Sequence, residues 1–237
     1  MSSKSISRFY KQVEAVEAED GVAVHLDGKP VKTPGGRKLA VINRALAEAI
    51  AAEWQAQDKA IRPATMPLTQ LASTALDRVG PDRAVIVEQL MKYAGTDLLC
   101  YRADRPADLV ARQTTGWQPL LDWVAQALDA PMVVTTGLLA VEQPPSTLAA
   151  LGRAMDRLDP WRLTAVQAAA AAMGSLVLAL ALAEGRIDAD QAFALSQLDE
   201  TYQMEQWGED YEAADRRAAL AADVAAAAAF ARLLHQS

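Results

Sequence analysis

The chain has 237 residues, of which 51% are apolar and 22% charged, and this balance excludes an intrinsically disordered chain. Its formal net charge of −7 and the lack of a lysine and arginine cluster argue against nucleic-acid binding, which needs a basic field. Cys100 is the only cysteine, so an intramolecular disulfide is excluded, and we expect a buried, inert thiol in a reducing compartment.

The first forty residues carry the signals of short strands joined by turns. The N-terminus, MSSKSISRFYKQV, has no apolar run, so we expect no secretory signal and a cytoplasmic protein. Turn residues separate the predicted strands, which cover residues 9–16, 22–26, 30–31 and 37–42. Connections this short predict antiparallel pairing, and a sheet with so few large apolar side chains must pack on helices.

The period of the apolar residues changes at Asn43, a residue type suited to a helix N-cap. Leu46, Ile50 and Trp54 then recur at every fourth position and form one apolar ridge of an amphipathic helix. Pro67 suits the first turn of a second helix. The region after the strands is therefore predicted to be helical.

Further helices follow from the spacing of apolar residues and from the prolines that open them. They are predicted over residues 82–93 and 106–128, then from residues 145, 160 and 188 onward, with a last helix ending near residue 234. Trp117 and Trp123 are expected to pack in the core. Between the helices predicted over residues 82–93 and 106–128, Thr96–Asp104 is a predicted connector in which Asp97 and Asp104 cap or pair locally.

One stretch, Leu163–Ala183, contains no charged residue and is long enough to cross a bilayer. It consists mainly of alanine, which gains little from lipid, and only Leu176–Leu182 is strongly apolar. We therefore expect one helix buried at the centre of a helical domain, with a membrane span as the alternative.

The segment LDETYQMEQWGEDYE combines carboxylates with aromatic residues. On a helix, Glu205, Glu209 and Glu212 would form one acidic stripe, because they lie at positions i, i+4 and i+7, and Gly208 is a residue that could interrupt this helix. The tyrosine and tryptophan close beside them suit a protein interface, where such rings supply contact area with a polar end. A solvated helix face with intrahelical ion pairs is the alternative interpretation.

The residue chemistry indicates a binding protein rather than an enzyme. The sequence has no glycine-rich phosphate loop and no nucleophile elbow, and its two histidines lie far from the cysteine along the chain. We predict no catalytic residue, no cofactor and no metal site. The alternative is a small-ligand-binding protein or enzyme that uses Glu205, Glu209 and Glu212, which would require a deep pocket and a raised carboxyl pKa.

Together these signals predict an α+β protein that is predominantly helical. A small N-terminal antiparallel β region is expected to pack on a multihelical C-terminal domain. The predicted domains are residues 1–80, which mix strands and helices, and residues 81–237, which are helical.

Six segments of the sequence, in their order along the chain, resemble one known family. They are RFYK (8–11), LDGKPVKTP (26–34), AEWQAQ with IRPATMPLTQLASTALD (52–57 and 61–77), TDLLCYRAD (96–104), WQPLLDW (117–123) and LDETYQMEQWGED (198–210). Each segment alone is a weak signal, but the series covers nearly the whole chain and is specific. Together they resemble the assembly chaperone that handles the α subunit of the F1 part of ATP synthase, in a bacterial form.

The resemblance implies a function that composition does not show. A chaperone of this family binds the newly made F1 α subunit, prevents its aggregation and releases it to the β subunit during α3β3 formation, without using ATP. The resemblance also implies a cytoplasmic location in bacteria and the mitochondrial matrix in eukaryotic relatives. We expect a monomer when the protein is free, with no nucleic-acid partner and no stable membrane insertion.

The resemblance assigns roles to individual residues. Trp54 corresponds to the tryptophan of the helix after the N-terminal sheet, and we expect it to pack that sheet against the helical domain. Glu212 corresponds to an acidic position after the Trp-Gly pair and is the first candidate for a partner contact. Because the spacing after this pair differs between members, Asp210 or Glu209 could occupy the place instead. The further candidates for partner contacts are Glu205, Tyr202, Gln203 and Trp207.

Overall fold

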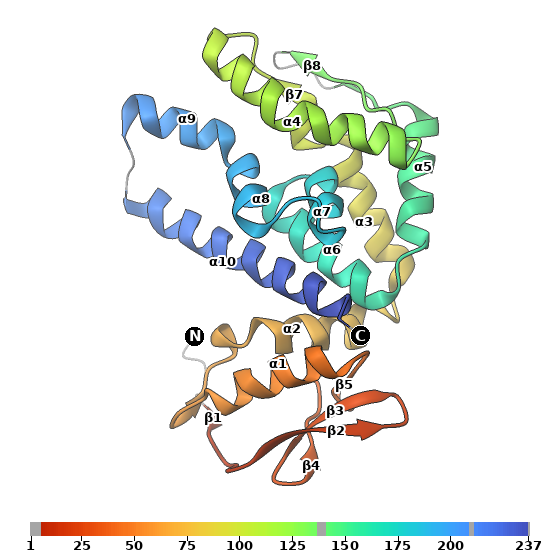
Figure 1. Ribbon diagram of the computed structural model, residues 1–237, viewed down its shortest axis with the longest axis vertical. Coiled ribbons are helices and arrows are strands. Elements are labelled where there is room, and N and C mark those ends of the chain that lie inside the picture. The colour runs from red at the N-terminus through yellow and green to blue at the C-terminus, as the bar shows by residue number, and fades with distance from the viewer. Residues whose placement is uncertain (1–5, 137–140, 209–210, 237) are drawn as a thin grey trace. The chain divides into compact units, whose positions relative to one another are not determined.

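The computed structural model describes residues 6–136, 141–208 and 211–236, and for residues 211–213 it describes the backbone only (Figure 1). Helices dominate this described part, and the strands are concentrated near the N-terminus. The predicted class, a predominantly helical α+β protein with a small N-terminal antiparallel sheet, is confirmed. The chain forms two compact units: unit 1 comprises residues 1–83, 160–164 and 229–237, and unit 2 comprises residues 84–159 and 165–228.

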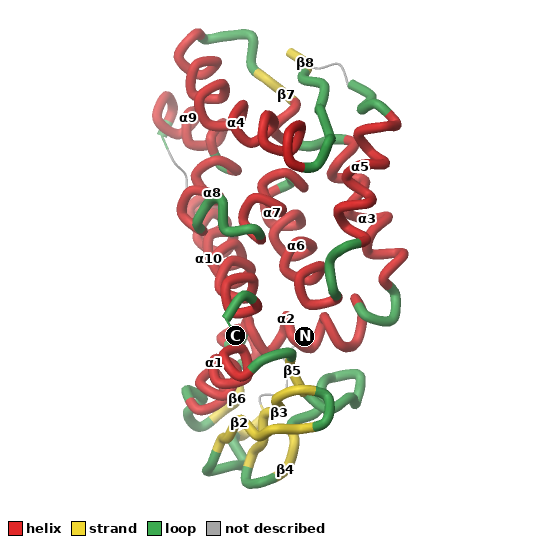
Figure 2. Tube along the Cα trace, turned by 45° about the vertical axis from the view of Figure 1, so that its right-hand side comes forward, coloured by secondary structure: helices red, strands yellow, loops and turns green. Residues whose placement is uncertain are grey.

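The sheet of unit 1 is antiparallel. Its strands are β2 (Val13–Ala18), β3 (Gly21–Leu26), β4 (Lys29–Pro30) and β5 (Ala40–Val41), and both β4 and β5 pair with β3. A separate antiparallel pair joins β1 (Ile6–Ser7) to β6 (Ala60–Ile61). Figure 2 shows the sheet strands on one side of α1 (Arg44–Gln55), which contacts β2, β3 and β5.

The first long strand starts later than predicted, at Val13 instead of residue 9. The reason lies in Asp27, whose carboxylate accepts hydrogen bonds from the backbone N–H groups of Lys11 (3.0 Å) and Gln12 (2.8 Å). These two N–H groups are therefore bonded to a side chain, and the bonds hold the segment before β2 against the β3–β4 turn. The same bonds lower the pKa of Asp27.

Two helices that follow the sheet of unit 1 begin where the sequence predicts. The Asn43 side chain accepts from the backbone N–H of Leu46 at 2.9 Å and caps α1. Helix α2 (Pro67–Thr74) starts at its proline and continues into a π-helical turn over residues 75–79. The Glu53 carboxylate of α1 accepts from the N–H groups of Leu68 (2.7 Å) and Thr69 (2.8 Å), so α1 also caps α2.

The remaining helices and one strand pair follow in chain order. They are α3 (Arg83–Gly95), β7 (Tyr101–Arg102), α4 (Ala107–Ala127), β8 (Thr135–Thr136), α5 (Pro145–Asp156), α6 (Pro160–Met173), α7 (Leu176–Ala183), α8 (Ala189–Ser196), α9 (Leu198–Trp207) and α10 (Tyr211–Leu234). Strands β7 and β8 pair in parallel. Helix α7 contacts α4 and α8, and its residues 176–182 are all buried, so it forms the centre of the unit 2 core.

The alanine-rich stretch forms two helices, so the prediction of one helix through Leu163–Ala183 is wrong. Gly174 takes a left-handed conformation with φ +67°, and this ends α6. Ser175 then caps α7 by accepting from the N–H of Leu178 at 3.0 Å. Within the described residues, no helix is long and apolar enough to span a bilayer.

Asp97 does more than the local capping that its sequence context predicts. Its carboxylate accepts from the N–H of Leu99 (3.1 Å) and also from the Ser175 hydroxyl (2.7 Å) and the N–H of Val177 (3.0 Å). The buried side chain therefore joins the connector before α4 to the N-terminus of α7. Burial raises the pKa of Asp97 to about 6, although the hydrogen bonds oppose the increase.

This raised pKa predicts a pH-dependent stability. Between about pH 4 and pH 6 the folded carboxyl holds a proton that the unfolded one has lost, so the free energy of unfolding falls as pH rises. The Asp97→Asn variant has no carboxyl group at this position and therefore lacks this titration. Denaturant titrations across this range should show the wild-type free energy of unfolding falling by about 2 kcal/mol relative to that of the variant. A difference that stays constant or rises with pH would contradict the prediction.

Candidate partner-binding surface

Helix α9 is held against α4 by a tyrosine and an ion pair. The Tyr202 hydroxyl, in a side chain only 7% exposed, donates to the Asp108 carboxylate at 3.0 Å. Glu205 forms an ion pair with Arg112 at 2.7 Å, and the Arg112 guanidinium also lies 5.2 Å from the centre of the Tyr202 ring. Burial and the Asp108 carboxylate raise the pKa of Tyr202. Tyr202 and Glu205 thus position α9 within unit 2.

Two further bonds fix the start of α9 and the end of α8. Gln113 of α4 donates to the Asp199 carboxylate at 2.7 Å, and the indole N–H of the fully buried Trp117 donates to the carbonyl of Leu195 at 2.9 Å. Since Asp199, Tyr202 and Glu205 are spaced by three residues, they share the side of α9 that meets α4. The predicted core positions of Trp117 and Trp123 are confirmed.

The opposite side of α9 is open. Glu200, Gln203 and Trp207 are exposed and lie at positions i, i+3 and i+7, so they form one face that we call the α9 outer face. Trp207 is 80% exposed, the highest value among the large apolar side chains of the described residues. Gly208, with φ +86°, ends the helix directly after it. Because tryptophan is enriched among the residues that dominate binding energy at interfaces, Trp207 is the candidate anchor of this face.

The segment of the predicted acidic stripe is not one continuous helix. Because α9 ends at Trp207, Glu205 lies on α9 while Glu212 lies on α10. Glu209 and Asp210 lie outside the described residues, as does the side chain of Glu212. The roles proposed for these three acidic residues therefore stay predictions.

Trp54 is positioned by the N-terminal segment of unit 1. Its ring packs edge-on against Tyr10, with 5.7 Å between ring centres, and the Tyr10 hydroxyl donates to the Trp54 carbonyl at 2.7 Å. Arg8 stacks on Tyr10 and donates to the carbonyl of Gln55 at 3.2 Å. The indole nitrogen of Trp54 is buried without a hydrogen-bond partner in the described part of the chain. Its expected role in packing unit 1 against the helices stays a prediction.

Glu205 does not have the environment that the alternative interpretation as an enzyme requires. The Glu205 side chain is 44% exposed and paired with Arg112, so it is not desolvated in a deep pocket. In residues 6–136, 141–208 and 211–236 no group of His, Cys, Asp and Glu side chains is placed to hold a metal ion. Cys100 is buried as predicted, and burial raises the pKa of its thiol to about 12, which suppresses the thiolate.

The two units differ in charge. Counted over the full sequence, unit 2 carries 20 Asp and Glu against 9 Lys and Arg, whereas unit 1 carries 10 Asp and Glu against 14 Lys and Arg. The acidity of the chain therefore belongs to unit 2, which contains the α9 outer face. A partner that approaches this face is favoured if its surface is basic, and the attraction weakens with salt.

Some residues of this surface have no signal in the local sequence. Asp108, Arg112 and Gln113 position α9 from about ninety residues away, and only the fold brings them together. Glu200, in contrast, has a signal in the local sequence. It lies seven residues before Trp207, and this spacing puts both residues on the same face of a helix.

Comparisons with known proteins agree on one family. A sequence profile of the family described as ATP12 chaperone protein matches residues 7–125. The crystal structure of Atp12 from Paracoccus denitrificans is 44% identical, covers 96% of this chain and 98% of its own, and has a TM-score of 0.91. The crystal structure of a protein from Agrobacterium tumefaciens is 40% identical with the same TM-score, covering 96% of this chain and 86% of its own. The mitochondrial protein atp12 of Schizosaccharomyces pombe is 26% identical over 216 residues, 86% of this chain and 74% of the relative.

Proposed function

The chain belongs to the family of ATP12 chaperone proteins, and from this premise we propose that it is an assembly chaperone for the F1 part of ATP synthase. Its client is the unassembled α subunit, which it protects from aggregation and releases to the β subunit as the α3β3 ring forms. It acts without ATP and without catalysis, as a monomer in the bacterial cytoplasm.

A ring subunit without its neighbours exposes a large apolar face that belongs at an obligate interface, and such faces self-associate. A protein that covers this face suppresses aggregation by a binding equilibrium alone, so no nucleotide is required. Release follows when the β subunit competes for the same or an overlapping surface. The chaperone must therefore bind the α subunit more weakly than the β subunit does within the assembling ring.

The α9 outer face is the observation that supports this proposal best. Trp207 offers a large apolar ring that is 80% exposed, and Gln203 and Glu200 continue the face with polar groups. An exposed aromatic anchor with a polar surround is the usual composition of a protein-binding hot spot. Glu212, Asp210 and Glu209 follow this face in the sequence, and we propose that they extend it with negative charge.

The test is co-expression of the chain with the α subunit of the same cell, in the absence of the β subunit, followed by size-exclusion chromatography. We expect the α subunit to remain soluble only when the chain is present, to co-elute with it, and to leave it when the β subunit is added. If the α subunit aggregates although the chain itself is folded, the proposed function is wrong.

A Glu212→Lys variant tests the acidic extension of the face. We expect unchanged helicity and melting temperature but weaker retention of the α subunit, because a charge reversal at a contact repels the basic surface that the glutamate attracts. Circular dichroism and the co-elution assay measure the two effects, and Glu88→Lys, which reverses an exposed charge on α3, is the matched control. A large drop in melting temperature would instead give Glu212 a structural role.

A further inference from the structure

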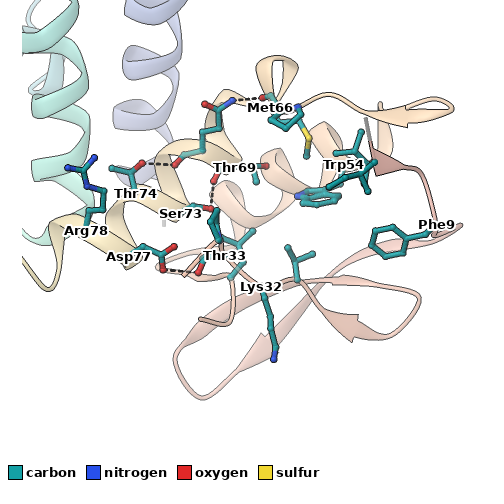
Figure 3. A pocket seen from close by; sticks show the side chains of 17 residues that line it. Phe9, Lys32, Thr33, Trp54, Met66, Thr69, Ser73, Thr74, Asp77 and Arg78 are labelled. Atoms are coloured by element: carbon teal, nitrogen blue, oxygen red, sulfur yellow. Dashed lines mark hydrogen bonds between the residues drawn. The ribbon is translucent and has the colours of Figure 1, made fainter. Parts of the chain in front are cut away.

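Unit 1 contains a cavity of about 560 Å³ between its sheet and its helices (Figure 3). Its floor is apolar and buried: Leu39 is fully buried, Met66 is 2% exposed, and Val31 is 7% exposed. Trp54 of α1 forms part of the wall. A cavity of this size and composition lies in the range of sites that bind small ligands or the side chains of a peptide.

The apolar lining continues out of the cavity onto the surface. Ile6 and Phe9 contribute to the lining but are 60% and 69% exposed, and both belong to the N-terminal segment that runs beside Trp54. In Figure 3, Phe9 lies at the Trp54 side of the cavity. A small molecule held inside would leave these two side chains in water. An occupant that covers them must extend past the rim, which favours a segment of a partner chain over a small ligand.

The side of the cavity formed by α2 is polar. The hydroxyls of Ser73 and Thr74 donate to the carbonyls of Thr69 (2.8 Å) and Gln70 (2.9 Å), so their oxygen lone pairs remain available as acceptors. A peptide backbone supplies N–H donors at regular spacing, and these hydroxyls can receive them. The cavity thus combines an apolar floor with a wall suited to a main chain.

The charges at the polar end are unbalanced. Asp77 accepts from the Thr33 hydroxyl and from the N–H of Gly35, both at 2.7 Å, and its charge is paired with the Arg37 guanidinium at 3.9 Å. The Arg78 side chain is exposed, and it makes no ion pair or side-chain hydrogen bond with any residue that the structure describes, whereas the Lys32 side chain points away from the cavity in Figure 3. Together with the excess of basic residues in unit 1, Arg78 favours an acidic group on the occupant.

We propose that this cavity binds an extended segment of the α subunit in which a bulky apolar side chain lies next to an acidic one. The apolar side chain fills the space between Trp54 and Met66 and covers Phe9, and the acidic side chain meets Arg78. The proposal rests on the proposed function for the identity of the client, and it adds a second contact to the one at the α9 outer face.

The experiment measures binding of overlapping, fluorescently labelled short peptides that span the α subunit to the full chain, by fluorescence anisotropy. We expect the peptides that bind to share the apolar–acidic pattern. Phe9→Ala and Arg78→Glu should each weaken their binding by about tenfold, because each removes one contact class at an exposed position. Ser73→Phe, which places a ring in the cavity, should abolish it.

Two variants serve as matched controls. Ile42→Ala removes a 48% exposed apolar side chain of unit 1 outside the cavity lining, and Lys38→Glu reverses an exposed charge of unit 1 that also lies outside the lining. Both should leave peptide affinity within about twofold of the parent. If Lys38→Glu weakens binding as much as Arg78→Glu, the effect comes from net charge and the inference is wrong.

Three further outcomes would also overturn the inference: no peptide binds, peptides bind with no dependence on Phe9 and Ser73, or dodecanoate competes for the cavity while no peptide does. Co-expression with the intact α subunit separates this failure from that of the proposed function. If the parent and the Phe9→Ala variant keep the α subunit soluble equally well and no peptide binds, the chaperone function holds and only the cavity inference fails.

Discussion

A Trp207→Ala variant is expected to keep the stability of the parent chain and to lose affinity for the α subunit by about 30-fold or more. The ring is 80% exposed, so its removal takes almost no packing from the fold. In a complex the same ring would be covered, and loss of a buried aromatic anchor costs on the order of 2 kcal/mol or more. The unlabelled parent chain keeps the α subunit soluble. Labelled variant is then titrated into this mixture, and its binding to the α subunit measures the loss of affinity.

Val85→Ala is the matched control, since Val85 is 52% exposed on α3 of the same unit. Its affinity for the α subunit and its melting temperature should equal those of the parent. If Trp207→Ala binds as tightly as Val85→Ala, the α9 outer face is not the binding surface. A fall in the melting temperature of Trp207→Ala would mean that the ring packs within the protein.

The opposite pattern is expected for Trp54→Arg, which should give little soluble protein. The substitution removes the ring that packs on Tyr10 and places a guanidinium beside buried apolar side chains such as Met66. Loss of such a ring alone costs on the order of 3 kcal/mol, and an unpaired charge adds to this. For a chain of this size, 3 kcal/mol corresponds to a fall in melting temperature of roughly 6–12 °C.

Soluble yield and thermal melting monitored by circular dichroism measure the effect. Trp54→Phe keeps an apolar ring and should retain most of the stability, and Trp207→Arg introduces the same cation at an exposed position and should fold normally. If Trp54→Arg is as stable as the parent, Trp54 has no structural role in unit 1. If Trp54→Phe is as damaged as Trp54→Arg, the indole itself is required.

Local signals in the sequence predicted much of the secondary structure. Asn43 caps α1, and Pro67 and Pro145 open α2 and α5, because a cap or a first-turn proline acts within one helical turn. The helix-rich α+β class followed from the same signals, and the series of six segments identified the family. Each of these features depends only on residues that are neighbours along the chain.

The tertiary structure decided which faces those elements present. Asp97 reaches Ser175 and Val177, and Tyr202 reaches Asp108, across separations of 78 residues or more that no local pattern encodes. The candidate site changed for the same reason: the predicted acidic stripe assumed one helix, whereas the break at Gly208 and the bonds from α4 turn Tyr202 inward and leave Trp207 outward. The sequence by itself determined the class, most helix starts and the family. Burial and long-range hydrogen bonds, which depend on contacts between distant segments, determined which side chains remain free to bind.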